Sequence, residues 1–268
     1  MRVAFIKMHG LGNDFVVLDG RRHNVPDLTL GAAAALANRH TGIGCDQVIL
    51  LEPSDTADFT MRIFNSDGGE VEACGNASRA VALLHGRDAQ VETAGGIIAL
   101  SPTRNGARVD MGKPRFAWDA IPLDYPMDCA AMPVSWEMLK APFAVNVGNP
   151  HVVFFVADSE AVPLDRLGPL IEHDALFPAR INVNVADIRG GIINLRVWER
   201  GVGLTKACGT GACAAAVAAI DKGLVTSPAH IRLPGGDLQV AWQRGGSIMM
   251  EGPAAESFRG TFEWSDFA

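Results

Sequence analysis

The chain has 268 residues, which is enough for about two domains of ordinary size. Its 48% hydrophobic and 20% charged residues are typical of a globular protein with a sizeable core, and its net charge of −7 argues against a basic surface for nucleic acid or an anionic membrane. The longest purely apolar run, 212–220, is too short to cross a bilayer, and no secretory apolar segment follows the first residues.

Short runs of β-branched and aromatic residues between Gly, Asp, Asn or Pro predict that strands dominate the fold. They are expected at 3–8, 15–18, 47–51, 59–64, 90–93, 143–147, 151–156, 181–188, 192–198 and 230–233. Helices are predicted at 29–39, 76–85, 164–173 and 210–221. Thr29 is the expected N-cap of the first helix. The last is apolar nearly all round, which indicates a helix buried inside other structure.

An internal repeat links the two halves of the chain. Segments 65–76 and 199–210 both run from a polar residue at the end of a predicted strand to an Ala-Cys-Gly that opens a predicted helix, at an offset of 134 residues. Three further pairs recur in the same order at offsets of 136 to 140: Gly12-Asn13 and Gly148-Asn149, Gly95-Gly96 and Gly235-Gly236, Met111-Gly112 and Glu251-Gly252. We predict two copies of one α/β unit at 1–118 and 143–268, joined by a proline-rich linker at 119–142.

The chain contains five cysteines, and this odd count without a signal peptide argues against a disulfide framework and favours a reducing cytoplasm. Cys74 and Cys208 occupy matching positions of the repeat, directly before a predicted helix. The positive end of the helix dipole is expected to lower the pKa of each thiol toward neutrality. Cys45, Cys129 and Cys213 are interpreted as packing residues.

The residues that follow the two cysteines predict a carboxylate site. Backbone N–H groups of Gly75 and Asn76, and of Gly209 and Thr210, open the two helices, where such groups have no acceptor within the helix. Two units facing each other across a pseudo-two-fold axis would place the thiols on opposite sides of one carboxylate ligand. One thiolate then removes the α-proton and the opposite thiol returns a proton to the other face, which inverts the stereocentre.

No metal-ligand spacing, dithiol redox motif or phosphate-binding glycine motif occurs in the sequence. The five lysines lie in no clear Schiff-base context. These absences argue against a metal site and against pyridoxal phosphate, and favour direct action of the two thiols on a small-molecule substrate.

Three segments resemble the signatures of the diaminopimelate epimerase family: 7–15 (KMHGLGNDF), the Asn65 to Asn76 segment, and the segment from Glu199 to Cys213. The resemblance implies interconversion of LL- and meso-2,6-diaminopimelate by two cysteines without a cofactor, in lysine and cell-wall precursor synthesis. It also implies an α/β (α+β) fold of two pseudo-symmetric domains, each a β-barrel-like sheet around a central helix, with the site in the cleft between them. A homodimer is usual in this family.

The resemblance also implies roles for individual residues. Cys74 and Cys208 match the acid/base cysteines. The substrate-binding positions of the family match Asn13, Gln47, Asn65, Gly75, Asn76, Asn149, Asn182, Glu199, Arg200, Gly209 and Thr210. His151 matches a residue near the site. Arg200 suits the distal carboxylate of a diacid, and Glu199 suits an amine.

The sequence leaves other functions open. Ala77 and Leu204 depart from the commonest family pattern, which bears on substrate preference. A racemase of another amino acid on the same scaffold is the alternative enzyme. A non-catalytic amino-acid-binding protein would be expected to lack one of the two cysteines, and both are present. A thiol-redox protein would work through a Cys74–Cys208 disulfide, which in the epimerase would instead abolish activity.

Overall fold

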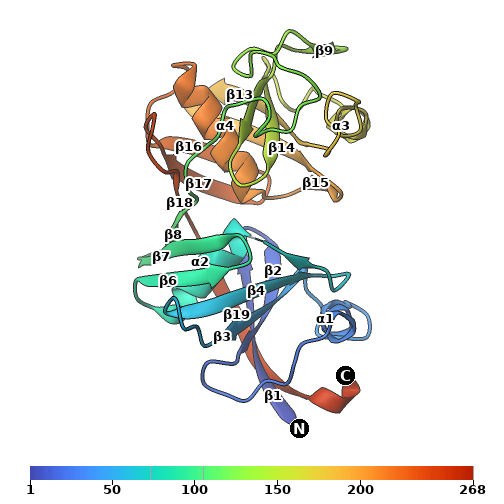
Figure 1. The fold of residues 1–268 in the computed structure, drawn as a ribbon, viewed down its shortest axis with the longest axis vertical. Helices are drawn as coiled ribbons and strands as arrows, with labels where there is room; N and C mark the ends of the chain where they lie inside the picture. Colours follow the sequence, from blue (N-terminus) through green and yellow to red (C-terminus); the bar gives the residue numbers. More distant parts are fainter. Residues whose placement is uncertain (73, 105, 268) are drawn as a thin grey trace. The chain divides into compact units, whose positions relative to one another are not determined.

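The computed structural model describes residues 1–72, 74–104 and 106–267. The chain divides into two compact units: Met1–Val109 with Gly252–Ala268, and Asp110–Glu251. Each unit is a mixed α+β structure in which strands outnumber helices (Figure 1), as the sequence predicts. None of the described helices is long and apolar enough to cross a membrane.

The first unit contains the first eight strands and the last one. They are β1 (Arg2–Gly10), β2 (Asn13–Asp19), β3 (Gln47–Glu52), β4 (Phe59–Asn65), β5 (Glu70–Val71), β6 (Ala89–Thr93), β7 (Gly96–Thr103), β8 (Gly106–Asp110) and β19 (Ala255–Glu263). Its helices are α1 (Leu30–Ala37), α2 (Gly75–His85) and the 3₁₀ helix η1 (Trp264–Asp266).

The second unit holds the remaining elements. Its strands are β9 (Ser135–Trp136), β10 (Leu139–Lys140), β11 (Phe143–Asn146), β12 (Pro150–Phe155), β13 (Asn182–Arg189), β14 (Ile192–Glu199), β15 (Gly203–Thr205), β16 (Ala229–Leu233), β17 (Gly236–Ala241) and β18 (Met249–Gly252). Its helices are α3 (Leu164–Glu172) and α4 (Gly209–Asp221).

The strand pairings show that one unit repeats the other. The order β1-β2-β3-β4 has antiparallel, parallel and antiparallel pairings, and β11-β12-β13-β14 has the same series. The parallel pair β4 and β6, on either side of α2 in the chain, recurs as β14 and β16 on either side of α4. The register also recurs, since Phe15 lies opposite Gln47 and His151 lies opposite Asn182. The duplication expected from the sequence is thereby confirmed.

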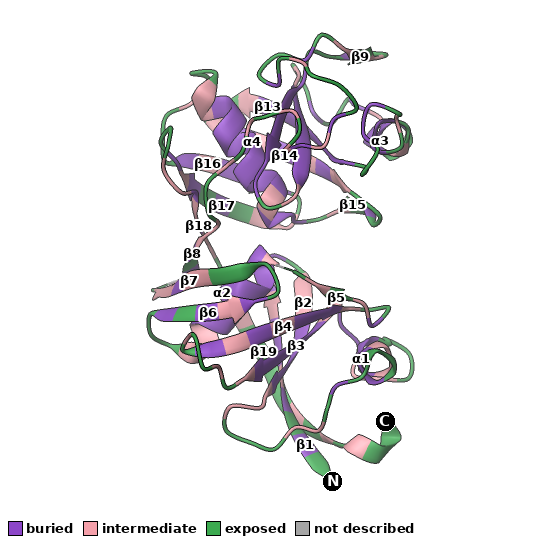
Figure 2. Ribbon diagram, in the orientation of Figure 1, coloured by how far each residue is buried: buried purple, intermediate pink, exposed green. Residues whose placement is uncertain are grey.

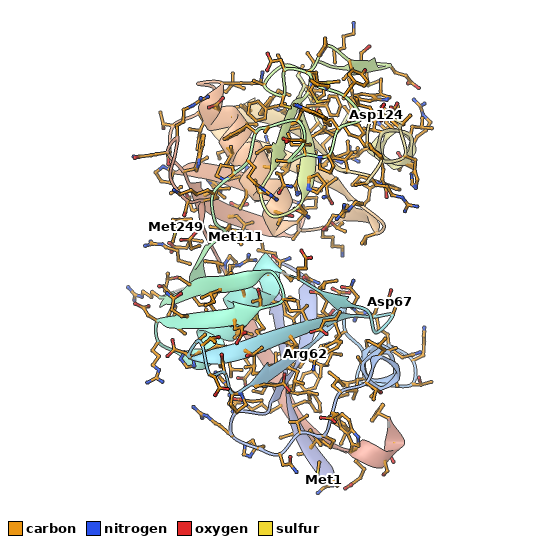
Figure 3. All side chains as sticks on the ribbon, viewed as in Figure 1. Met1, Arg62, Asp67, Met111, Asp124 and Met249 are labelled. Carbon is orange, nitrogen blue, oxygen red and sulfur yellow. The ribbon has the colours of Figure 1, made fainter. Side chains whose placement is uncertain are left out.

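The chain passes between the two units twice, at 109/110 and again at 251/252. After the first passage Arg115 pairs with Asn146 of β11, and after the second β19 pairs along β1. The repeated Met111-Gly112 and Glu251-Gly252 lie at these two passages. Within the second unit, the Met111 N–H donates to the Ile248 carbonyl at 2.8 Å; Figure 3 labels Met111 and Met249 at this point.

These pairings change two of the expected boundaries. The repeat predicts a second unit at 143–268, but 252–268 belongs to the first unit because β19 extends its sheet at β1. The expected linker, 119–142, lies within the second unit. It contributes apolar side chains to the core of that unit: Ile121, Leu123, Cys129, Met132 and Leu139. Burial of these side chains is what turns a proline-rich segment into part of the unit.

The central helix of the second unit, α4, is almost completely buried among strands. All but three residues of α4 are buried, and Figure 2 shows this helix in the colour of buried residues along most of its length. Its alanines let β11, β12, β13, β14, β16 and β17 approach it from several sides. The prediction of a helix buried inside other structure is confirmed. Thr29 also caps α1 as predicted, because its Oγ1 accepts from the Ala32 N–H at 3.2 Å.

Candidate functional site

Cys74 and Cys208 are the N-caps of the two central helices. Both have an extended backbone, with φ −146° and ψ 109° for Cys74 and φ −122° and ψ 111° for Cys208. The Cys74 sulfur accepts from the Ala77 N–H at 3.5 Å, and the Cys208 sulfur accepts from the Gly211 N–H at 3.3 Å. Each sulfur therefore lies at the positive end of its own helix, as the repeated Ala-Cys-Gly predicts.

In the first unit, several predicted residues meet at the starting ends of β2 and β3. Asn13 begins β2, and its Oδ1 accepts from Asn76 Nδ2 at 3.2 Å and from the Cys74 thiol at 3.8 Å. Gln47 begins β3 and lies opposite Asn65 of β4. Its Nε2 donates to Asn65 Oδ1 at 2.9 Å. Gln47 Oε1 is buried without a hydrogen-bond partner among the described residues. A buried acceptor of this kind favours a ligand that brings a donor.

A charged network that the sequence reasoning missed orients Asn13. Asn13 Nδ2 donates to Asp46 Oδ2 at 2.9 Å, which leaves Oδ1 for Cys74. Arg39 bonds both Asp46 (2.6 Å) and Asp14 (2.5 Å). Although burial alone would raise the pKa of Asp14, hydrogen bonds from Arg39 and Lys7 hold it well below its usual value. Lys7 and Asp14, both in segment 7–15, were the sequence features that could have indicated this network.

In the second unit, Cys208 lies beside Glu199 and Thr210. Its sulfur is 3.4 Å from Thr210 Oγ1, and Glu199 accepts from Thr205 Oγ1 at 2.5 Å. Burial raises the pKa of the Cys208 thiol well above its usual value, and the negative charge of Glu199 adds to this rise. Burial likewise raises the pKa of Glu199. The predicted lowering of the thiol pKa is therefore wrong for Cys208, because desolvation and the charge of Glu199 outweigh the hydrogen bonds from Thr210 and the Gly211 N–H.

His151 is fully buried and held in one tautomer. Asn184 Nδ2 donates to both the Val152 carbonyl (2.9 Å) and His151 Nδ1 (3.0 Å), so Nδ1 is an acceptor. The proton is therefore on Nε2, which lies 2.8 Å from Asn149 Oδ1 and donates to it. Burial lowers the pKa of His151 to about 3, so the ring stays neutral at physiological pH. Sequence reasoning missed Asn184, although alternation along β13 puts it on the same face as Asn182.

The low pKa of His151 predicts a loss of stability in acid. Its ordinary pKa is 6.5, against about 3 in the folded protein. Below pH 6.5 the unfolded chain binds a proton that the folded chain does not. The neutral ring of His151 therefore makes its full contribution to the free energy of unfolding above pH 6.5. Below that pH the free energy of unfolding falls by about 1.4 kcal/mol per pH unit, down to about pH 3. Urea unfolding between pH 7 and pH 5 should show a steeper loss for the wild type than for His151→Gln. Equal pH dependence of the two would contradict this assignment.

The Asn182 side chain links the backbone of Pro150 to the backbone of Arg200. Asn182 Nδ2 donates to the Pro150 carbonyl at 2.8 Å, and its Oδ1 accepts from the Arg200 N–H at 2.9 Å. The Arg200 guanidinium is exposed and donates to the Ala179 carbonyl at 3.0 Å. The Asn182 side chain thus orders the turn that carries Arg200.

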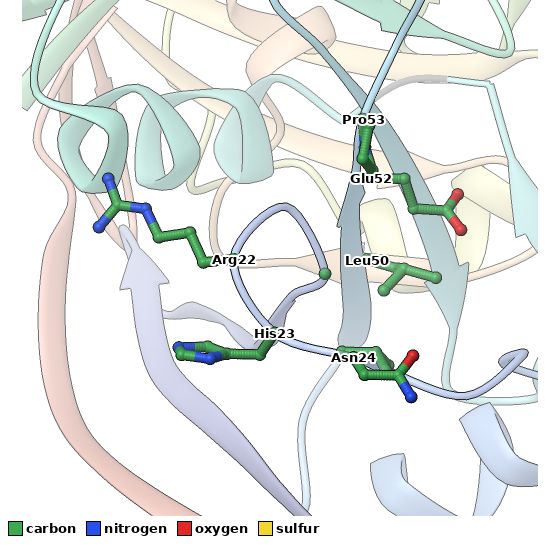
Figure 4. Close-up of a pocket in the computed structure, with 8 residues that line it drawn as sticks. Arg22, His23, Asn24, Leu50, Glu52 and Pro53 are labelled. Carbon is green, nitrogen blue, oxygen red and sulfur yellow. The ribbon is translucent and has the colours of Figure 1, made fainter.

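A surface pocket of about 360 Å³ lies elsewhere in the first unit (Figure 4). It is lined by Gly20, Arg22, His23, Asn24, Val25, Leu50, Glu52 and Pro53. Since β2 and β3 run parallel, these residues lie at the opposite ends of the strands from Asn13 and Gln47. The pocket contains none of the predicted site residues. Among the residues that the structure describes, no cluster of His, Cys, Asp and Glu is arranged to hold a metal.

Comparison with solved structures defines the structural class. A phenazine-biosynthesis PhzF-family protein of Enterococcus faecalis matches with a TM-score of 0.73 at 13% identity, covering 98% of this chain and 100% of that one. A probable proline racemase of Agrobacterium radiobacter K84 matches with a TM-score of 0.66 at 17% identity, covering 96% and 92%. The chain therefore shares its two-unit α+β fold with these two proteins.

Comparison of sequences identifies the family. Residues 5–117 and 143–256 match the diaminopimelate epimerase family model. A diaminopimelate epimerase of Erythrobacter litoralis is 66% identical over 269 residues, covering all of both chains. One of Rhizorhabdus wittichii is 60% identical, covering all of this chain and 98% of the relative. The chain belongs to the diaminopimelate epimerase family.

Proposed function

We propose that this protein is an isomerase that interconverts LL- and meso-2,6-diaminopimelate by moving the α-proton between two cysteines. The observation that carries the proposal is the matched pair of helix-capping cysteines, Cys74 and Cys208. Full-length relatives at 66% and 60% identity bear the name diaminopimelate epimerase, which supports the substrate.

The starts of the two central helices supply the proposed carboxylate site. The first backbone donors within the helices are the Ser78 N–H, to the Cys74 carbonyl at 2.9 Å, and the Ala212 N–H, to the Cys208 carbonyl at 3.0 Å. The amides of the first two residues of each helix lie at its positive end, where an anion is favoured. These residues are Gly75, Asn76, Gly209 and Thr210.

In the proposed reaction one thiolate takes the proton from the α-carbon, and the bond's electron pair stays on that carbon. The opposite thiol then donates its proton to the other face, so that one sulfur gains a proton and the other loses one. The raised pKa of Cys208 suits its thiol form, ready to donate. A substrate ammonium placed at Glu199 would offset the carboxylate charge that disfavours the thiolate.

The remaining substrate contacts are part of the same proposal. Arg200 takes the distal carboxylate, and Asn13, Gln47, Asn65, Asn149 and Asn182 line or order the site. Gln47 Oε1 supports this placement because a buried acceptor there suits a substrate ammonium. His151 holds Asn149 through its Nε2–H bond, so that Asn149 Nδ2 is left for the ligand.

We further propose, from the family, a cytoplasmic homodimer that works without a cofactor. Light scattering coupled to size-exclusion chromatography measures the oligomeric state directly. A monomeric mass would contradict the dimer and leave the proposed chemistry unaffected.

The decisive experiment is exchange of the α-hydrogen of diaminopimelate in deuterated water under reducing conditions. We expect deuterium to enter the α-position as the LL and meso forms interconvert. Exchange with other L-amino acids but not with diaminopimelate would instead indicate a racemase of another substrate. Activity that requires oxidation of the thiols would indicate redox function, because a disulfide consumes both acid/base groups.

A further inference from the structure

The carboxylate of Glu172 forms two hydrogen bonds in the second unit, outside the set of residues assigned to the substrate. Glu172 ends α3 and is 2% exposed. Its Oε2 accepts from the Trp198 indole N–H at 2.7 Å, and its Oε1 accepts from the Gly201 backbone N–H at 2.9 Å. Arg180 Nη1 lies 3.9 Å from Oε1. A buried carboxylate with a donor on each oxygen fixes both donors in place.

The two donors flank the residues proposed to bind the substrate. Trp198 directly precedes Glu199, and Gly201 directly follows Arg200. Glu172 therefore fastens both sides of the Glu199-Arg200 pair. Gly201 has a φ of 76°, so the backbone turns sharply at the fastened amide.

The position of α3 explains why Glu172 reaches this turn. A side chain at Gly168 would place its Cβ only 2.5 Å from Cγ of Trp198, so the helix backbone packs directly on the indole. Residues four apart lie on the same helix face, which brings Glu172 to the nitrogen of that same indole.

We propose that Glu172 is a positioning residue that sets where Arg200 meets the distal carboxylate of the substrate. The inference rests on the proposed function, because it assigns that carboxylate to Arg200. Glu172 acts through the Gly201 backbone and not by touching the ligand. Glu199 remains fixed by β14 pairing, since it lies opposite Gly203. Arg200 lies outside the strand, where Asn182 holds its N–H on one side and the turn at Gly201 sets the backbone on the other.

Glu172→Gln tests the proposal. A carboxylate accepts from both donors, but a glutamine has one acceptor oxygen and presents its own N–H groups to the second donor. We expect the KM for diaminopimelate to rise at least about tenfold while kcat stays within about threefold, since such a pattern reports lost substrate binding. A merely structural role would lower the folded fraction, and so would reduce apparent kcat and leave KM unchanged.

The double variant Glu172→Gln with Trp198→Phe is the matched control. Phenylalanine removes the indole N–H, so the introduced glutamine can give its oxygen to the Gly201 N–H and turn its amide nitrogen toward the ring. We expect KM to return to within about threefold of the Trp198→Phe single variant. A wild-type KM in Glu172→Gln, or no recovery in the double variant, would overturn the proposal.

Hydrogen exchange of the Gly201 amide tests the anchor without any substrate. In Glu172→Gln this amide should exchange at least about tenfold faster than in the wild type. Unchanged protection overturns the role of Glu172 whatever the substrate is. A wild type that fails to exchange the α-hydrogen of diaminopimelate overturns the proposed function instead, so the two failures are distinguishable.

Discussion

Replacing Cys74 or Cys208 with serine should lower the rate of epimerisation by about a thousandfold or more. The hydroxyl of serine is far too weak an acid to supply a base near neutral pH. The fold should persist, because serine is a favourable N-cap and its Oγ can accept the bonds that now go from Ala77 to Cys74 and from Gly211 to Cys208. The loss therefore reports the proton transfer and not the packing of the helices.

Each serine variant keeps one thiol, which sharpens the test. With a base on only one face, a variant should exchange solvent deuterium into one stereoisomer of diaminopimelate and not into the other. The two variants should show opposite preferences. Cys129→Ser is the control, because Cys129 lies in the hydrophobic core of the second unit and has no part in the proposed proton transfer. The rate of this variant should stay within about twofold of the wild type. Full turnover by either Cys74→Ser or Cys208→Ser would rule out the two-thiol mechanism.

The helices could be predicted because their signals are local. The apolar face of 76–85 and the alanine-rich 210–221 are each readable within one window of sequence, and the structure begins each of these helices one residue earlier. Strands β5 and β15 could not be predicted, since two or three residues carry no period. Strand β19 was missed for a different reason: it is defined by its pairing with β1, at the other end of the chain.

The duplication was visible in the sequence. The sequence did not show that the chain enters the second unit at 109/110 and returns to the first at 251/252. Met111-Gly112 and Glu251-Gly252 were recognisable as matching positions of the repeat, which share the glycine. That the chain changes unit at both places depends on pairing between residues distant in sequence, such as Arg115 with Asn146. Repeat order follows from sequence alone, whereas the partner of a strand depends on tertiary contacts.

In the candidate site, too, local features could be predicted from the sequence and features that depend on tertiary contacts could not. The position of each cysteine before a helix follows from a local motif. The environment of each thiol depends on burial and on side chains from other strands, which is why a lowered pKa was predicted for Cys208 and a raised one is found. Asp46 was missed because its role rests on a bond to Asn13 that no spacing rule encodes. Alternation along β13 gives the face of Asn184 but not its bond to His151.

Glu199→Gln should change the acidity of Cys208 and the rate in opposite directions. The charge of Glu199 disfavours the Cys208 thiolate, so removing that charge should lower the pKa of this thiol. The oxygen of the introduced glutamine can still accept from Thr205, so the local geometry should be kept. The substrate amine, however, loses its charged partner, and kcat/KM for diaminopimelate should fall by about tenfold to a hundredfold.

Ultraviolet absorbance of the thiolate, measured against pH and corrected with the matching Cys208→Ser protein, reports the pKa of Cys208. Glu199→Asp is the matched control, because it retains the charge and should leave that pKa raised. If Glu199→Gln left the pKa unchanged, burial alone would set the acidity of Cys208. If it left kcat/KM unchanged, Glu199 would not bind the substrate amine. A more acidic thiol in a slower enzyme is the combination that requires Glu199 to act on both the cysteine and the substrate.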